Sequence, residues 1–262
     1  MSVSAGDTRL TAPLREQAPL HEQGPLYEQA SLCERLALPV SVPGRTAVWW
    51  WRIPGTADPR DVALLQPADH IRLSRIRSPA RTVEFITSRA RIRTVLGALL
   101  EVRPEDVELG RRPCPCCADP EHGPPAVLRP ATPLWIGVSH TAGCGMLAVS
   151  DGPVGIDVER VRQVRTDDLA AAVLAPAEAA HLRSLPEGPA RTGAFLRVWT
   201  RKEAVLKGVG IGIATDLTAV ETHPQSEAPV TVSAGLPGAP VPWSVSDLAL
   251  PGPWLAALAC RS

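Results

Sequence analysis

The clearest structural pattern in this chain is Val154-Gly155-Ile156-Asp157-Val158-Glu159, in which apolar and acidic side chains alternate. A period of two predicts a strand with one buried face and one polar face. Ile156 and Val158 then point toward the core, whereas Asp157 and Glu159 share the opposite face. Two carboxylates on one face repel each other unless a cation or a shared proton relieves them. Mg²⁺ suits such a pair because it binds hard oxygen ligands, although a solvated outer strand face shows the same alternation.

A second pattern lies about 40 residues later, in the helix predicted over Thr192–Lys207. Trp199, Glu203 and Lys207 are spaced four apart and form one stripe, and Gly208 is the expected C-cap. An ordinary surface Glu–Lys pair has the same spacing. The chain, however, contains only two lysines among its 27 basic residues, Lys202 and Lys207. Their closeness indicates that the ammonium groups themselves are used, and Glu203 is then a third carboxylate for a metal site.

The rest of the sequence mixes helical and antiparallel-strand patterns, which predicts the α+β class. Strands are expected over residues 46–53, 134–139, 145–150, 230–233, 243–245 and 254–260. Helices are expected over residues 69–77, 82–100 and 169–185. Asp151-Gly152 predicts a tight turn that pairs residues 145–150 with the strand at 154–158. Residues 110–133, rich in Pro, Cys and Gly, are predicted to form a loop.

Residues 13–36 repeat a six-residue unit that begins Pro-Leu in three copies and Ser-Leu in the last. Six residues turn a helix by 600°, so successive leucines fall on different faces, and the prolines interrupt helix or ladder alike. We therefore predict that residues 1–43 form a leader outside the core.

Charge and composition exclude several classes of protein. The 27 basic and 27 acidic residues give a net charge of zero, which argues against a nucleic-acid or polybasic membrane binder. The N-terminus lacks signal-peptide features, and the apolar stretches are too short to span a membrane. Three of the six cysteines lie within four residues, which suits no ordinary disulfide framework and predicts a cytoplasmic setting. Cys114, Cys117 and His122 have zinc-like spacing, but free thiols are favoured because a second Cys/His pair does not follow.

Ser139-His140 ends a predicted strand. Adjacent Ser and His rarely act as nucleophile and base, and the chain has no G-x-S-x-G elbow. We interpret the pair as donors to phosphate, with a structural histidine as the alternative. Gly208-Val-Gly210-Ile-Gly212 is not followed by the Gly-Lys-Ser/Thr of a phosphate-binding loop, and no dinucleotide-binding fingerprint is present.

The paired motifs Gly155-Ile-Asp157-Val-Glu159 and Trp199-x-x-Lys202-Glu203-Ala-x-x-Lys207 resemble the Sfp-type 4′-phosphopantetheinyl transferases. Val138-Ser139-His140-Thr141 and the region from Leu65 to Gly97 are also similar to that family, so the resemblance covers about residues 46–260. It implies two pseudo-symmetric α+β halves, residues 44–153 and 154–262, with coenzyme A (CoA) bound in the cleft between them. It also implies transfer of the phosphopantetheine arm of CoA to a serine of an acyl or peptidyl carrier protein, by a monomeric enzyme.

The resemblance implies roles for individual residues. Asp157, Glu159 and Glu203 would hold Mg²⁺, with Mn²⁺ as the alternative, and Glu203 would also help to deprotonate the attacking serine. Lys207 and Lys202 would stabilise charge on the phosphates. Ser139, His140, Arg72 and Arg89 would contact CoA. Such chemistry requires positioning and charge neutralisation, and the nucleophile comes from the partner.

One departure from the family pattern concerns a Gly-Lys-Pro or Gly-Arg-Pro motif, which here reads Gly123-Pro124-Pro125. A basic residue is therefore missing, and Arg129 and Arg112 are the candidate substitutes. Two other functions remain open. A non-catalytic CoA-binding module would lack a metal carboxylate, and all three are present. A metal nuclease with a Glu-x-Lys core would need Lys two residues after Glu203, where Val205 stands. The carrier could belong to fatty-acid, polyketide or nonribosomal-peptide synthesis.

Overall fold

The computed structural model describes residues 33–38, 42, 44–119, 123–164, 166–211, 215–227, 229–233 and 242–261, with side chains from 169 onward in the helix that begins at 166. Its strands are β1 (Glu34–Arg35), β2 (Thr46–Arg52), β3 (Glu108–Arg111), β4 (Pro125–Arg129), β5 (Trp135–Thr141), β6 (Cys144–Ser150), β7 (Val154–Arg160), β8 (Val230–Val232), β9 (Trp243–Leu248) and β10 (Trp254–Arg261). Its helices are α2 (Pro59–Ala63), α3 (Pro67–Leu73), α4 (Pro79–Leu100), α5 (Thr166–Val173), α6 (Pro176–Ser184) and α7 (Pro189–Val209), with short 3-10 turns at Pro104–Asp106 and Leu217–Ala219.

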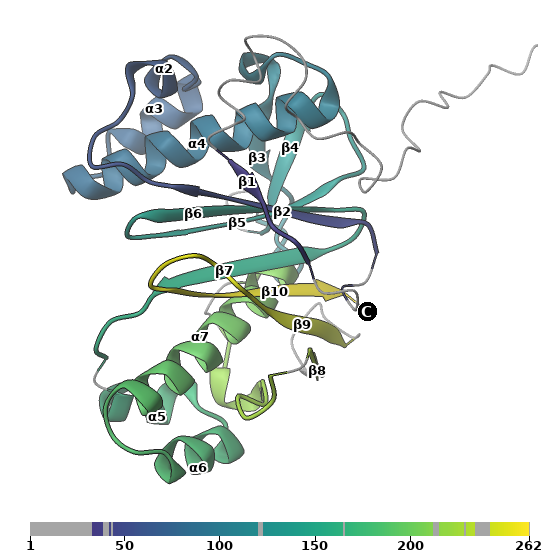
Figure 1. The fold of residues 1–262 in the computed structure, drawn as a ribbon. Coiled ribbons are helices and arrows are strands. Elements are labelled where there is room, and N and C mark those ends of the chain that lie inside the picture. Colours follow the sequence, from purple (N-terminus) through teal and green to yellow (C-terminus); the bar gives the residue numbers. More distant parts are fainter. Residues whose placement is uncertain are drawn as a thin grey trace, which may run out of the picture.

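Two antiparallel sheets form the centre of the molecule. The first has the strand order β1-β2-β6-β5 and the second β7-β10-β9-β8, while β3 and β4 form a separate hairpin. The sheets lie one above the other, with α4 on the outer side of the first and α7 on the outer side of the second (Figure 1). This arrangement confirms the predicted mixture of helices and antiparallel strands.

The three consecutive tryptophans of β2 show why the first sheet is covered on both faces. Trp49 and Trp51 pack into a cluster with Ile92, Val95 and Leu96 of α4. Trp50 points to the opposite face and packs between the two sheets, where its ring centroid lies 6.2 Å from that of Trp254. All three are at most 2% exposed. A strand with both faces buried needs large apolar side chains at every position rather than at alternate ones.

The structure corrects the predicted leader. Cys33 and Val42 are 8% and 6% exposed and belong to the core clusters, and β1 pairs with β2. The folded part therefore begins before residue 43, because these apolar side chains bury surface against the sheets. Residues 1–32 lie outside the described residues.

The predicted hairpin around Asp151-Gly152 was wrong. β6 pairs with β2 and β5, whereas β7 pairs with β10 along its whole length. The Asp151-Gly152 turn therefore carries the chain from the first sheet to the second. A local turn signal identifies the bend, but partner choice is set by packing over the whole sheet.

Three further boundaries differ from the sequence prediction. The helix expected over 169–185 is two helices, because Pro176 starts α6 and cannot continue α5. The loop expected over 110–133 contains the end of β3 and all of β4. The long C-terminal helix continues to Val209, and its αL cap is Gly210 (φ 85°) rather than Gly208. Within the described part of the chain, no helix is both long and apolar enough to cross a membrane.

Candidate active site

Two glycines bring α7 unusually close to β7. A Cβ on Gly155 would lie 1.9 Å from the carbonyl oxygen of Ala204 and 2.4 Å from the amide nitrogen of Gly208. A Cβ on Gly208 would in turn lie 3.1 Å from the amide nitrogen of Gly155. The absence of side chains at both positions lets the two backbones touch. Residues next to these glycines, on the strand and on the helix, can therefore contact each other directly.

Lys207 and Asp157 are the first such pair. The Lys207 Nζ donates to Asp157 Oδ1 at 2.5 Å and to Ser139 Oγ at 3.0 Å. The Ser139 hydroxyl donates to the same Asp157 oxygen at 2.9 Å and accepts from the Val158 amide at 3.3 Å. Ser139 comes from β5 of the first sheet, so this network joins the two sheets to α7. The other oxygen of Asp157, Oδ2, is buried and has no hydrogen-bond partner within the described part of the chain.

Glu159 and Glu203 lie in the same region, as the strand and helix periodicities predict. The Trp199 indole donates to Glu159 Oε1 at 3.2 Å, so the stripe on α7 faces β7. Burial raises the pKa of Glu159, and the charge of Asp157 raises it further. Burial also raises the pKa of Glu203; Lys207 opposes this shift, and Asp157 and Glu159 add to it. Three carboxylates and one lysine thus share a partly buried region.

The donor chemistry of this carboxylate cluster fits a hard divalent cation. The buried Oδ2 of Asp157 has no partner among the described residues, and the charge of Asp157 disfavours the ionised forms of Glu159 and Glu203, which a cation would relieve. The side chains are not closed around one point, however: among the described residues, no three His, Cys, Asp or Glu groups are close enough to hold a metal ion. The metal role of these three residues remains a prediction.

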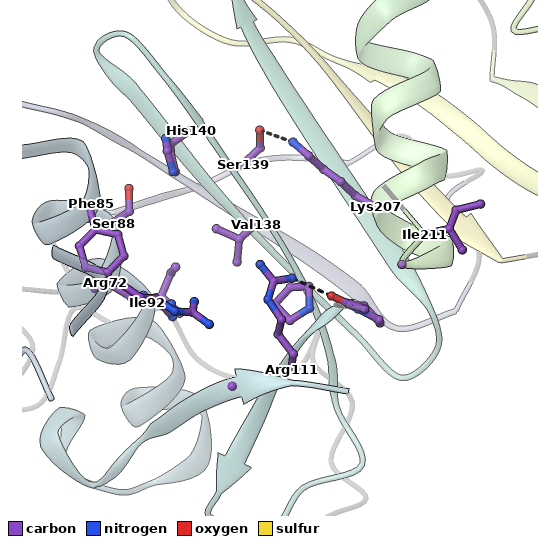
Figure 2. Close-up of a pocket in the computed structure, with 16 residues that line it drawn as sticks. Arg72, Phe85, Ser88, Ile92, Arg111, Val138, Ser139, His140, Lys207 and Ile211 are labelled. Atoms are coloured by element: carbon purple, nitrogen blue, oxygen red, sulfur yellow. Dashed lines mark hydrogen bonds between the residues drawn. The ribbon is translucent and has the colours of Figure 1, made fainter. Parts of the chain in front are cut away.

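A pocket of about 800 Å³ opens beside this cluster (Figure 2). Ser139, His140 and Lys207 line one part of it, and Gly123, Pro124 and Gly210 form another wall. A third wall is one face of α4, which contributes Phe85, Ser88, Arg89 and Ile92 at helical spacing. Arg72 and Arg111 also line the pocket. A pocket of this size accommodates a ligand as large as a nucleotide.

The pocket is strongly cationic at its arginine side. Arg89 pairs with Asp69 at 3.1 Å, and its guanidinium lies 5.4 Å from the Phe85 ring centroid. Burial lowers the pKa of Arg89 to about 10; Asp69 opposes this shift, and the nearby charges of Arg72, Arg93 and Arg111 add to it. The positive charges of these arginines repel one another, and a bound anion would offset this unfavourable electrostatic energy.

His140 also lines the pocket and lies near its positive charges. Its Nδ1 lies 3.8 Å from Glu84 Oε2, and its side chain is 43% exposed. Burial lowers the pKa of His140, and the positive charges of Lys207, Arg81 and Arg89 add to this shift, while Glu84 opposes it. The structure therefore brings Ser139, His140, Arg72, Arg89 and Lys207 to one pocket.

Lys202 lies elsewhere, which corrects the prediction that it contacts phosphate. Its side chain is 1% exposed, and its ammonium makes an ion pair with Glu178 at 2.6 Å. It also donates to the carbonyl oxygens of Val173 at 2.6 Å and Leu217 at 2.8 Å. These three partners match the three N–H donors of an ammonium group. The two lysines are thus both used as point charges, but only Lys207 faces the pocket.

The pocket also contains residues that the sequence reading missed. Ser88 is 4% exposed, and its hydroxyl finds no hydrogen-bond partner among the residues that the structure describes. Arg111 reaches the pocket from the end of β3. The helical spacing of Phe85, Ser88, Arg89 and Ile92 could have indicated Ser88, whereas Arg111 lay in the segment predicted as a loop.

The proposed substitutes for the missing basic residue both lie outside this pocket. The Arg112 guanidinium carbon is 3.9 Å from the Trp135 ring centroid, and its Nη2 donates to the Leu134 carbonyl. Arg129 pairs with Glu108 at 3.3 Å on the surface. For the zinc hypothesis, Cys114 is buried and Cys117 exposed, and His122 lies outside the described residues.

Arginines around a pocket of this size, beside three carboxylates and a lysine, are typical of proteins that bind phosphorylated ligands. Comparison with known sequences gives the particular family. The profile of the 4′-phosphopantetheinyl transferase superfamily matches residues 153–259. The 4′-phosphopantetheinyl transferase HetI of Nostoc is 32% identical over 174 residues, covering 63% of this chain and 69% of HetI. The chain therefore belongs to the 4′-phosphopantetheinyl transferase superfamily.

Other relatives agree with this assignment. A Synechocystis protein, slr0495, is provisionally named as such a transferase and is 31% identical over 160 residues, covering 60% of this chain and 62% of its own length. The 4′-phosphopantetheinyl transferase AcpT of Salmonella typhi is 40% identical over 105 residues, covering 39% of this chain and 53% of AcpT. The chain thus spans between about half and two thirds of these two relatives.

Proposed function

We propose that this protein transfers the 4′-phosphopantetheine arm of CoA to a serine hydroxyl of an acyl or peptidyl carrier protein and releases adenosine 3′,5′-bisphosphate. The observation that carries this proposal is the meeting of Lys207 and Asp157 at the rim of an arginine-lined pocket of about 800 Å³. In the reaction, the serine oxygen forms a new P–O bond, the P–O bond to the adenosine bisphosphate breaks, and the serine proton leaves.

The pocket would bind the nucleotide end of CoA. Arg72 and Arg89 supply positive charge, and Phe85 and Ile92 supply an apolar surface beside it. The Ser88 hydroxyl, which has no partner in the described ranges, would be available to a polar ligand atom. The side chains of Ser139 and His140 complete the wall nearest Lys207. Charge-assisted hydrogen bonds from guanidinium groups are well suited to phosphate oxygens.

Asp157, Glu159 and Glu203 would hold Mg²⁺, or alternatively Mn²⁺, on the diphosphate. A bound divalent cation polarises phosphoryl oxygens and neutralises the charge that develops on them. Lys207 would add its own positive charge next to the leaving phosphate. Glu203 would also help to deprotonate the attacking serine.

The family fold implies two pseudo-symmetric halves, residues 44–153 and 154–262. The pocket residues fit a site between them, because Arg72 and Ser139 come from the first part and Lys207 from the second. Both parts of the pocket lie in one chain, so a monomer would contain the whole site. The free cysteines support a cytoplasmic enzyme.

The test is intact-mass spectrometry of an apo carrier protein incubated with this protein, CoA and Mg²⁺. We expect a mass gain of one phosphopantetheine group, which is lost with EDTA and with the Asp157→Ala variant. A gain that persists with Asp157→Ala would overturn the metal assignment. Binding of CoA without any gain on fatty-acid, polyketide and peptide carriers would instead indicate a CoA-binding module of the same fold.

A further inference from the structure

Arg111 is a pocket residue that neither strand nor helix periodicity identifies. It is the last residue of β3, and its side chain points into the pocket, where Figure 2 marks its bond to a neighbouring carbonyl. In that bond, Arg111 Nη1 donates to the carbonyl oxygen of Gly123 at 2.7 Å. A guanidinium has five N–H donors in a rigid fork, so this contact fixes the direction in which the group presents its charge.

The local backbone explains how Gly123 comes to hold Arg111. The Arg112 amide donates to the Pro124 carbonyl at 2.9 Å, which brings the two chain segments together. Gly123 adopts a φ of 81°, and a Cβ there would lie 2.3 Å from the Arg112 carbonyl oxygen. Only glycine fits both the positive φ and this close approach. The Gly123 carbonyl is therefore held in place beside β3, where it can accept from Arg111.

The charge environment indicates what Arg111 is for. Arg72, Arg89 and Arg111 all line the pocket, and none of its lining residues within the described part of the chain is acidic. The charge of Arg111 acts on Arg89, since it contributes to lowering the pKa of Arg89. Placing several guanidinium groups around one cavity is unfavourable for the empty protein and favourable for an anion with more than one negative charge.

We propose that Arg111 is a phosphate-binding residue of the CoA pocket, held in position by the Gly123 carbonyl and replacing the basic residue that this chain lacks at Pro124. The inference rests on the proposed function and deepens it. Arg111 and Pro124 line the same pocket, whereas Arg112 and Arg129 are not among its lining residues. Its partner is either the 3′-phosphate or the diphosphate of CoA.

The experiment measures the affinity of the full-length protein for CoA by calorimetry, for wild type, Arg111→Ala and Arg112→Ala at one ionic strength. A hydrogen bond to a charged group contributes about 1.5–3 kcal/mol, so we expect Arg111→Ala to weaken CoA binding by about 10- to 100-fold. Arg112→Ala is the matched control, because its side chain lies outside the pocket, and we expect a change of less than about threefold. Arg111→Lys keeps the charge but loses the fork, and we expect an intermediate loss.

Dephospho-CoA separates the two phosphate sources. If Arg111→Ala weakens the binding of CoA and dephospho-CoA by the same factor, Arg111 contacts the diphosphate; if it weakens only CoA, Arg111 contacts the 3′-phosphate. Arg111 is exposed, so we expect its variants to have the Tm of wild type. If Arg111→Ala does not fold, the affinity of Arg111→Lys for CoA tests whether Arg111 binds phosphate. Wild type that binds no CoA would overturn the proposed function and this inference together. Two results would overturn this inference alone, provided that wild type binds CoA. In the first, Arg111→Ala binds CoA as tightly as wild type; in the second, Arg112→Ala weakens CoA binding as much as Arg111→Ala does.

Discussion

Gly155 is the position where one added methyl group should disturb both the fold and the site. The Cβ of Gly155→Ala would lie 1.9 Å from the Ala204 carbonyl oxygen and 2.4 Å from the Gly208 amide nitrogen. Both are backbone atoms of α7, so no side chain can rotate away to make room. Ordinary contacts of a Cβ begin at 3.4 Å. The helix must therefore move away from β7 by more than an ångström.

The size of the effect follows from this displacement. Overpacking a well-packed core costs about 1–3 kcal/mol or more, and for a chain of this size each kcal/mol lowers the Tm by about 2–4 °C. Because both clashing atoms belong to the backbone, the cost should reach the upper value of about 3 kcal/mol, and we expect Gly155→Ala to lower the Tm by about 6–12 °C. The same movement separates Lys207 Nζ from Asp157 Oδ1, which now lie 2.5 Å apart. A misplacement of about 1 Å in a catalytic group can cost about 100-fold in rate.

Gly152→Ala provides the matched control, because a Cβ at Gly152 meets no atom within 4 Å. The assay is thermal melting of both variants, followed by the transfer of phosphopantetheine to a carrier protein at a temperature where both are folded. Gly152→Ala should behave like wild type in both measurements. An unchanged Tm for Gly155→Ala would refute the close packing of α7 on β7. A lowered Tm with full activity would refute the claim that this packing positions Lys207.

Three further outcomes follow from the structure. Lys202→Met leaves the Glu178 carboxylate buried without its cation, so we expect a urea titration to show a loss of about 3–5 kcal/mol in the free energy of unfolding. The affinity of this variant for CoA should not change. Weaker CoA binding by the folded variant would instead support the prediction that Lys202 contacts CoA. Folding lowers the pKa of His140 below 6.5, so His140 favours the fold above pH 6.5 and this contribution is lost as the pH falls through its folded-state pKa. Bound CoA should raise that pKa by cancelling the charges of Lys207 and Arg89, and an NMR titration that shows no rise would contradict the pocket assignment. Deleting residues 1–43 should lower the Tm, because Val42 and Cys33 are buried; an unchanged Tm would support the leader boundary predicted from sequence.

The local patterns in the sequence predicted the two elements that build the site. Alternation placed Asp157 and Glu159 on one face of a strand, and the four-residue spacing placed Trp199, Glu203 and Lys207 on one face of a helix. The structure confirms that these two faces meet, since Trp199 bonds Glu159 and Lys207 bonds Asp157. Backbone periodicity is a local property, so it can be read from neighbouring residues alone.

The same patterns could not say which residues meet across the molecule. Lys202 and Lys207 occupy one helix, yet Lys202 is enclosed by Glu178, Val173 and Leu217, which belong to other elements. The position of a residue in a helix gives the direction of its side chain from the helix axis. The elements packed against that side of the helix decide whether the side chain contacts a carboxylate or lines a pocket. The scarcity of lysine therefore indicated that both ammonium groups are used, but not where.

The sequence by itself determined the α+β class, the strand and helix that carry the carboxylates, and the family motifs. Tertiary structure alone decided that β7 pairs with β10 instead of β6, that residues 33–38 and 42 join the folded unit, and that Arg111 reaches the pocket. Each of these depends on contacts between residues far apart in the chain. Such contacts are selected by the surface that the whole fold buries and by the charges it brings together, and no short stretch of sequence contains that information.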